Sequence, residues 1–177
     1  MPDEILEQAV LRLAQQQQRR LYGKFRGIVT NNQDPDQQGR IRAKVPELFG
    51  DDPTGWAMPC VPFAPPDAGW LALPEVDSNV WIEFEAGDPS RPIWVGGWWP
   101  QGKAPAVSSP SVKLLQTAAG HKITLDDTSG SELVSVEDKS GAKITLSQQS
   151  LELKKGSMKI QLTDSQITIN DGALTVM

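Results

Sequence analysis

Cysteine and histidine are almost absent from this chain of 177 residues, which contains one cysteine, Cys60, and one histidine, His121. A single cysteine excludes an intramolecular disulfide and a zinc site built from several cysteines. One cysteine and one histidine far apart in the sequence offer little for serine–histidine or cysteine–histidine catalysis. Because Cys60 lies in the apolar run from Met58 to Val61, we expect a buried, unreactive thiol. We therefore expect no enzyme and no cofactor.

Long apolar runs and an excess of positive charge are also missing. No stretch approaches the roughly 18 consecutive apolar residues of a membrane span, and the N-terminus shows no signal-peptide pattern. We therefore expect a protein synthesised in the cytoplasm. The net charge of -5 and the pI near 4.9 argue against a protein whose main task is to bind nucleic acid or anionic membrane. The hydrophobic share of 38% is low for a globular chain, as expected where subunits share a core.

The last third of the chain repeats one short phrase. The segment HKITLDD begins at His121, AKITLSQ begins at Ala142, and MKIQLTD begins at Met158. Each copy places apolar residues at i and i+2, which is the period of a strand with one buried face. Turn-forming residues such as Ser140 and Gly141 separate the strands. Strands this short cannot build a core within one chain, but they suit a β-prism or β-helix in which copies bury their apolar faces together.

Charged residues in this region are mixed in sign along the sequence, which indicates a solvated prism surface. The lysines concerned are Lys139, Lys143, Lys154, Lys155 and Lys159. Acidic residues at Asp126, Asp127 and Asp171 fall in predicted turns, where aspartate accepts local backbone hydrogen bonds. A calcium loop would need more oxygen ligands than these turns offer.

Composition divides the chain into four segments. The sequence of residues 1–21 predicts an amphipathic helix, whose apolar stripe must dock on its own domain, on a sister copy or on a partner; we favour a sister copy or a partner. Residues 22–100 predict a compact all-β domain, residues 101–112 a linker, and residues 113–177 the short strands described above. All six tryptophans precede residue 100, and 12 of the 14 prolines lie in residues 35–105. The composition therefore changes at the linker.

The all-β domain has the strand pattern of a small barrel. Alternation predicts that Ile41, Ala43 and Val45 share one face, with three cations on the other. Further strands are expected near residues 25–30, 80–85 and 92–97, and a long excursion runs from residue 48 to residue 70. Five or so short strands of this kind match a Greek-key barrel of the oligonucleotide/oligosaccharide-binding (OB) type.

Two other functions fit an OB barrel. One is binding of nucleic acid, for which tryptophan rings and a basic strand face are present: Arg26, Arg40, Arg42 and Lys44. The other is binding of carbohydrate or a receptor by a module with a trimerising tail. The acidic total charge, and tryptophans that lie among prolines and glycines, favour packing and subunit interfaces instead. The pair Glu83 and Glu85 is interpreted as a solvated strand face.

Several separated blocks resemble the barrel domain of spike proteins from contractile injection machines. The longest block is YGKFRGIVTNNQDPDQQGRIRAKVPEL, from Tyr22 to Leu48. Further blocks are Gly55 to Ala57, Pro74 to Pro89 and Arg91 to Trp98, in the same order as in the family. The family includes phage baseplate assembly protein V, the valine-glycine-repeat spikes of type VI secretion and the spikes of extracellular tail-like particles. The resemblance covers about 75 residues of the barrel.

The resemblance implies a homotrimer whose C-terminal region is a triple-stranded, intertwined β-helix. It predicts interchain hydrogen bonds along the whole length of this needle. It also predicts a shared trimer core made of Ile123, Leu125, Val134, Val136, Ile144, Leu146, Ile160, Leu162, Ile167 and Ile169. No lysozyme domain separates the barrel from the needle, and the His-x-His motif that holds iron in some phage spikes is absent near residue 177. We expect neither metal nor catalysis.

The resemblance also implies partners. A trimeric baseplate hub is expected to contact the barrel end of the chain, through Leu6, Val10, Leu13, Arg40 and Arg42. A small tip protein of the proline-alanine-alanine-arginine (PAAR) repeat family is expected on the apolar strand formed by Leu174, Val176 and Met177. The spike would belong to a virion tail or tail-like particle and touch the target membrane transiently, with no nucleic-acid partner. The sequence does not distinguish a phage from a secretion system.

Overall fold

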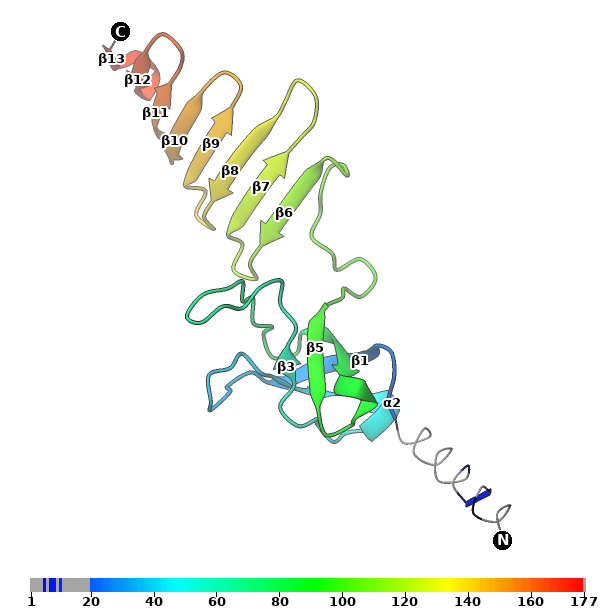
Figure 1. Cartoon of the computed structure of the whole chain (residues 1–177). Coiled ribbons are helices and arrows are strands. Elements are labelled where there is room, and N and C mark those ends of the chain that lie inside the picture. Colours follow the sequence, from blue (N-terminus) through cyan, green and yellow to red (C-terminus); the bar gives the residue numbers. More distant parts are fainter. Residues whose placement is uncertain (1–4, 6, 9, 11–19, 177) are drawn as a thin grey trace. The chain divides into compact units, whose positions relative to one another are not determined.

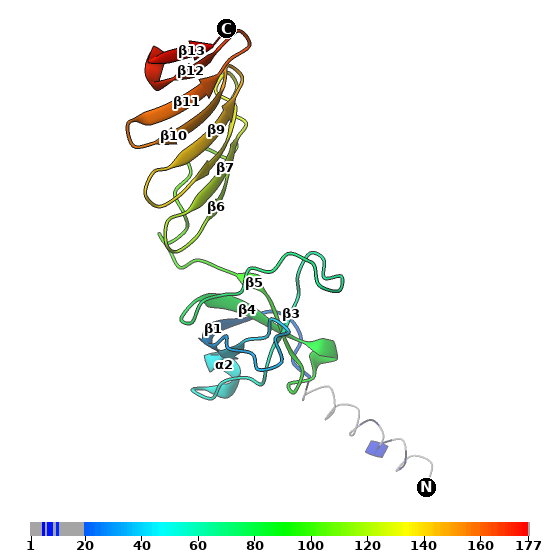
Figure 2. The same cartoon turned by 90° about the vertical axis from the view of Figure 1, so that its left-hand side faces the viewer.

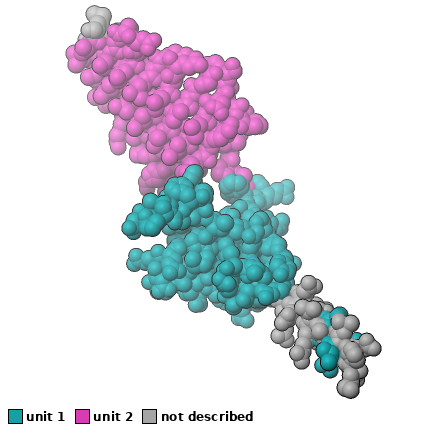
Figure 3. Space-filling view, in the orientation of Figure 1, with its two compact units in different colours: residues 1–102 teal, residues 103–177 magenta. Residues whose placement is uncertain are grey.

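The computed structural model describes residues 20–176, together with residues 5, 7, 8 and 10. The chain forms two compact units, residues 1–102 and residues 103–177, coloured separately in Figure 3. The division between the units falls inside the linker predicted at residues 101–112. Each unit is described by itself below.

The first unit is a small β domain with two short helical turns. Its elements, labelled where space allows in Figure 1, are β1 (Phe25–Asn31), β2 (Arg42–Lys44), α2 (Pro46–Phe49), β3 (Met58–Pro59), β4 (Asn79–Phe84), η1 (Glu85–Gly87) and β5 (Pro92–Gly97). The strands form one sheet in the order β2-β1-β4-β5-β3. All neighbouring pairs are antiparallel except β3 and β5, which are parallel.

A backbone bridge joins the two ends of this sheet. The Ile41 N–H donates to the Ala57 carbonyl at 3.2 Å, and the Ala57 N–H donates to the Ile41 carbonyl at 2.7 Å. Ile41 precedes β2 and Ala57 precedes β3, so the bridge links the two outermost strands. The curled five-stranded sheet is OB-like, and the prediction of an all-β fold with an OB-type first domain is confirmed.

Alternation along the strands builds the core of the first unit. Ile41, Ala43 and Val45 are fully buried, as their spacing predicts, and they pack with Val29, Ala57, Val80, Ile82, Phe84 and Trp94. The Phe84 ring makes edge contacts with Phe25 and Phe49 at centroid distances of 5.8 and 6.0 Å. Strand β1 approaches this core closely at Gly27, where a Cβ atom would lie 3.0 Å from the Ile82 side chain. This close approach explains why the strand has glycine there.

The helix predicted over residues 1–21 lies mostly outside the described residues. Arg20 and Leu21 are described and are not helical. The Leu21 N–H instead donates to the Gly87 carbonyl at 2.8 Å, and the Arg20 guanidinium donates to the Ala86 carbonyl at 2.9 Å. The chain therefore enters the first unit as a non-helical segment hydrogen-bonded to η1.

The prediction of a buried Cys60 is wrong, because this side chain is exposed. The Cys60 N–H donates to the Trp94 carbonyl at 2.9 Å. This hydrogen bond is the last backbone contact of the segment with β5. Strand β3 has only two residues, and the chain leaves the sheet at Cys60 to begin the long excursion. An apolar run in the sequence therefore does not place this thiol in the core.

The second unit is a single antiparallel meander of eight strands. These are β6 (Val112–Gln116), β7 (Lys122–Asp126), β8 (Leu133–Glu137), β9 (Lys143–Ser147), β10 (Leu151–Lys155), β11 (Met158–Leu162), β12 (Ile167–Ile169) and β13 (Leu174–Val176), with η2 (Asn170–Gly172) before the last. Each strand pairs with the next in sequence order, so the strands follow one another like rungs from β6 to β13 (Figure 2).

Two features of this meander differ from expectation. The first strand, β6, precedes the repeated phrase that begins at His121 and was not predicted, because its sequence VKLLQ places Leu114 and Leu115 side by side and breaks the alternation. Strands β7 to β12 pair on both sides within their own chain. Interchain hydrogen bonds along the whole needle are therefore wrong for these inner strands, whose backbone groups already have partners.

Removing part of the barrel core provides a test of the packing in the first unit. We expect Ile82→Ala to lower the free energy of unfolding by about 2–5 kcal/mol, because Ile82 is fully buried. Ile28→Ala is the matched control in the neighbouring strand: Ile28 is 41% exposed, so its loss is expected to stay below about 1 kcal/mol. Denaturant unfolding followed by tryptophan fluorescence reports on this unit alone, since all six tryptophans lie in it. Equal losses for the two variants would contradict the assignment of the core.

Candidate functional site: the apolar face of the second unit

One face of the eight-stranded sheet carries two continuous rows of apolar side chains. The antiparallel register aligns residues of successive strands directly opposite one another. The first row consists of Leu115, Ile123, Val136, Ile144, Leu153, Ile160, Ile169 and Leu174. The second row consists of Leu125, Val134, Leu146, Leu151, Leu162, Ile167 and Val176. We call this surface the apolar face.

The opposite face is polar along its middle. Between the positions of the two rows, the register aligns Thr124, Ser135, Thr145, Glu152, Gln161 and Thr168. Ser135 is only 3% exposed and is the single buried residue among those described in the second unit. The sheet of one chain therefore has a half-buried polar face and a bare apolar face, the reverse of a globular domain.

Most side chains of both rows are exposed, and Leu151, Leu162 and Ile169 are partly exposed. Ile123, Ile144 and Ile160 are 42%, 43% and 38% exposed, and their neighbours across the strands are similar. Covering the exposed half of such a side chain is worth roughly 1 kcal/mol, and each copy brings the fifteen side chains of the two rows. Adding a copy costs roughly 4–15 kcal/mol in lost freedom. Complete rows therefore supply enough free energy for association, whereas isolated side chains would not.

All ten residues predicted for the trimer core lie on the apolar face. The two described residues of the predicted tip, Leu174 and Val176, continue the same rows into β13, whereas Met177 lies outside the described residues. The prediction omitted Leu115, Leu151 and Leu153, which the register places in these rows. The alternation of Leu151 and Leu153 in LELKK carried a usable signal, but Leu115 became recognisable only once β6 was paired with β7.

Hairpin turns hold the register of the rows. The Asp138 carboxylate accepts hydrogen bonds from the Ser140 and Ala142 N–H groups, both at 2.8 Å, and from the Ser140 hydroxyl. These hydrogen bonds hold the pKa of Asp138 below its usual value, and the bond from the Ser140 side chain has the largest effect. Asp126 accepts from the Thr128 N–H at 2.9 Å, and its pKa is lowered by hydrogen bonds to Thr128 in the same way. Asp126, which was predicted in a turn, and Asp138, which was not named in that prediction, thus fix turn geometry.

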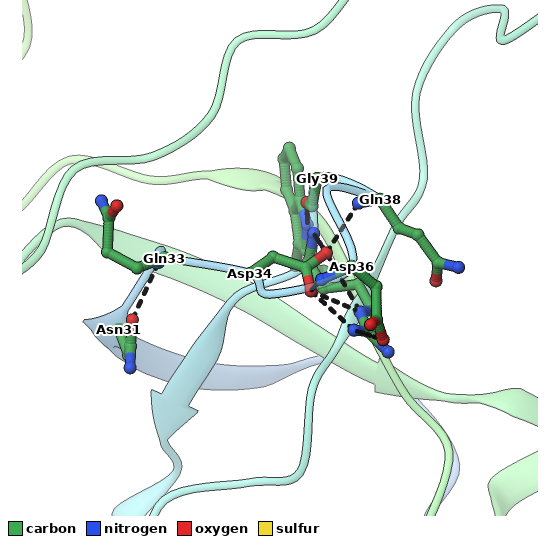
Figure 4. Close-up of polar contacts among 8 residues, drawn as sticks. Asn31, Gln33, Asp34, Asp36, Gln38 and Gly39 are labelled. Atoms are coloured by element: carbon green, nitrogen blue, oxygen red, sulfur yellow. Dashed lines mark hydrogen bonds and ion pairs between the residues drawn. The ribbon is translucent and has the colours of Figure 1, made fainter.

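In the first unit, Arg40 holds a loop together. Its guanidinium donates to both Asp34 carboxylate oxygens, the shortest contact being 2.6 Å, and also to the Asp36 carboxylate. The Asp34 carboxylate in addition accepts the backbone N–H groups of Asp36, Gln38 and Arg40 (Figure 4). Arg40 was predicted to contact a hub protein, and this remains a prediction. The contacts described here give Arg40 a role within its own chain.

Three arginines of the first unit stack on tryptophan rings. The Arg26 guanidinium lies 4.7 Å from the Trp98 ring centre and 5.8 Å from that of Trp81, and the Arg42 guanidinium lies 5.0 Å from the Trp56 ring centre. Arg40 approaches the same Trp56 ring from 5.7 Å. These cation–π contacts use the rings and cations that an OB-type nucleic-acid groove would offer to bases and phosphates.

The part of the chain that the structure describes contains no group of three or more histidine, cysteine, aspartate and glutamate side chains arranged to hold a metal ion. Its helices include none that is both long and apolar enough to cross a membrane. The apolar face is therefore the most extensive feature that needs a functional explanation.

Comparison with known families identifies both units. Residues 25–99 match the family described as the type VI secretion system/phage-baseplate injector OB domain. Residues 111–175 match the phage baseplate V C-terminal trimerisation domain. The chain belongs to the phage baseplate V spike family. No curated protein matches the chain.

Membership of the baseplate V family explains the bare apolar face. The trimerisation-domain match runs from residue 111 to residue 175 and therefore contains both apolar rows except for Val176. The protein forms a homotrimer, and it has a structural role in a baseplate spike of a phage tail or tail-like injection machine.

Placing a charge on the apolar face tests its role in trimerisation. We expect Ile123→Asp to abolish the trimer, because three carboxylates would be buried without partners. Thr124→Asp is the matched control: Thr124 is the next residue of the same strand, lies on the polar face, and has the uncharged partners Leu114 and Ser135. Light scattering should give three times 19.3 kDa for the wild type and the control, and 19.3 kDa for Ile123→Asp. A trimeric Ile123→Asp protein would place the subunit contact elsewhere.

Acid is expected to weaken the first unit through Asp34. The hydrogen bond from the Arg40 side chain holds the pKa of Asp34 well below its usual range, although its side chain is only 4% exposed and burial acts in the other direction. The stabilisation is therefore complete above the unfolded pKa of about 3.9 and is lost as the pH falls below it. Tryptophan fluorescence unfolding between about pH 6 and pH 3 should show this loss.

The variant Asp34→Asn should be less stable than wild type at pH 6, and the difference should shrink towards pH 3. Asp52→Asn, which changes an exposed carboxylate in the same unit, is the control and should follow the wild-type profile. A constant difference between Asp34→Asn and wild type across this range would contradict the assigned role of the Asp34 charge.

Proposed function

We propose that the trimer is a non-enzymatic spike that attaches to a baseplate hub, projects the second unit as a rigid needle and helps to breach a target envelope. The observation that carries this proposal is the bare apolar face, since the sheet is incomplete as a single chain. Three copies that cover one another's apolar faces form a shaft whose core runs along its whole length.

The mechanics of such a shaft suit puncture. Adjacent strands lie about 4.8 Å apart, so eight rungs give a shaft on the order of 30 Å long. Every rung contributes side chains to the common core, and an inner rung can lose its contacts only if the chains separate. Unfolding of this shaft is therefore expected to be slow, which favours survival of the needle when the sheath contracts.

Attachment to the hub is proposed for the first unit and the segment before it. Val10 is exposed and Arg42 lies over Trp56 at the barrel surface, which leaves both able to contact another protein. Leu6 and Leu13, predicted for the same contact, lie outside the described residues. Arg40 can take part only through a guanidinium already held by Asp34 and Asp36.

A tip protein of the PAAR type is proposed for the β13 end of the sheet. Within the described residues β13 pairs only with β12, so its other edge presents unpaired backbone groups. Leu174 and Val176 are 55% and 56% exposed at the ends of the two rows. A protein bound there would provide hydrogen-bond partners for the unpaired backbone groups of β13 and would cover the end of the trimer core.

The alternative of a nucleic-acid- or carbohydrate-binding OB module is less well supported. Arg26 and Arg42 are stacked on tryptophan rings of their own chain, and Arg40 is paired with two carboxylates. The net charge of -5 opposes phosphate binding as well. We therefore assign these aromatic and cationic residues to the stability of the barrel and, for Arg42, to the proposed hub contact.

Genetic complementation in the phage or bacterium that encodes the chain tests the proposed function. Loss of the gene should leave tails unable to deliver their contents, and the wild-type gene and Thr124→Asp should restore delivery. Ile144→Asp should not restore delivery, because Ile144 lies in the middle of the first apolar row. The pair Leu174→Asp and Val176→Asp should reduce delivery, and should weaken the trimer less than Ile144→Asp does, because both residues lie at the end of the rows. Normal delivery without the gene would contradict the proposal.

A further inference from the structure

The register of the meander separates charges that are mixed along the sequence. Alternate turns lie at opposite ends of the strands, so the hairpins divide between two edges of the sheet. One edge contains residues 116–122, 137–143, 154–159 and 169–174, and we call it the lysine edge. The other contains residues 126–133, 147–151 and 162–167, and we call it the acidic edge. Charges of both signs that follow one another along the sequence are therefore divided between two edges of the sheet.

The lysine edge carries six of the seven lysines of residues 113–177: Lys122, Lys139, Lys143, Lys154, Lys155 and Lys159. It carries three acidic residues, Glu137, Asp138 and Asp171. The acidic edge carries Asp126, Asp127, Glu132 and Asp164, and the seventh lysine, Lys113, lies next to it. One edge is thus net positive and the other net negative.

The acidic residues of the lysine edge are already engaged within the chain. Glu137 lies 3.9 Å from Lys143, Asp171 pairs with Lys159, and Asp138 accepts the hydrogen bonds of its own turn. Among the described residues, Lys122, Lys139, Lys154 and Lys155 have no carboxylate within ion-pair distance. The lysine edge therefore has a surplus of unneutralised positive charge.

A like-charge contact makes this surplus costly. The register sets Lys154 directly opposite Lys143 on one side and Lys159 on the other. Opposed like charges on adjacent strands destabilise a sheet. On the acidic edge, Glu132 accepts a hydrogen bond from Gln148 at 2.8 Å but has no cation, and among the described residues Asp164 has no ion-pair partner. Each edge thus lacks the charge that the other has in excess.

Symmetry brings these two edges together. In a cyclic trimer the contacts are heterologous, so one edge of each copy meets the opposite edge of the next. With the apolar faces turned inward and the sheets parallel, every lysine edge meets an acidic edge. Turning one copy end for end, with the apolar faces still opposed, would set lysine edge against lysine edge. Apolar rows alone do not distinguish these arrangements, because hydrophobic burial is non-directional.

We propose that the lysine edge of one copy pairs with the acidic edge of the next in the trimer, and that this pairing makes the three chains run in the same direction. The proposal rests on the homotrimer and adds the surface that orients its subunits. Lys154 and Lys155 are the principal cations, and Glu132 and Asp164 are the principal anions. The partner of each edge is a second copy of this chain.

Charge reversal on the full-length chain tests the pairing. One variant carries Lys154→Glu and Lys155→Glu, a second carries Glu132→Lys and Asp164→Lys, and a third carries all four changes. At about 20 mM salt we expect each two-residue variant to dissociate at roughly tenfold higher concentration than wild type. The four-residue variant should recover most of the loss, since its edges again have opposite charge. In about 1 M salt, where the screening length is about 3 Å, the differences should fade.

Two comparisons make the outcome decisive. Lys103→Glu reverses a charge outside both edges and should leave the trimer unchanged, which controls for net charge. The edge pairing would be wrong if the trimers of the two-residue variants were as stable as the wild-type trimer at low salt. It would also be wrong if the four-residue variant did not recover trimer stability. Neither result would contradict the homotrimer itself. A wild-type chain of 19.3 kDa in solution would overturn the homotrimer and the pairing together.

Discussion

Burial of the two apolar rows by sister chains is the interaction on which the second unit depends. A single sheet has two faces and needs a second layer to form a core, and this chain supplies only one layer. The first unit is different, because its sheet curls and closes through the Ile41–Ala57 bridge around its own core. One chain thus combines a domain that is complete alone with one that is completed only by association.

The sequence predicted the elements whose side chains alternate. Ile41, Ala43 and Val45 were assigned to one face and are fully buried, and the ten predicted trimer-core residues share one face of the meander. Alternation is a local property, so it can be read without knowledge of the fold. The same reasoning missed β6, where Leu114 and Leu115 are adjacent, because one of the two must point to the polar face.

Other features depend on the path of the chain and were beyond local reasoning. Cys60 was expected inside because its neighbours are apolar, yet β3 ends before it and the chain leaves the sheet. The separation of lysines from acidic residues depends on which hairpin ends at which edge, and that requires the lengths of all the strands and turns. Arg40 was interpreted as a surface cation. Its partner Asp34 lies at the other end of a loop, and the sequence alone does not indicate that the two side chains meet.

The in-chain meander also determines how the proposed needle would bear load. Backbone hydrogen bonds in a sheet lie perpendicular to the strands, so in this ladder they point from rung to rung. Compression along the ladder pushes each rung onto the next and loads all the rungs together. Tension on the last strand would instead break the bonds of one rung at a time, as in the opening of a zipper. A shaft of this construction is strong when pushed and can be dismantled from its end when pulled.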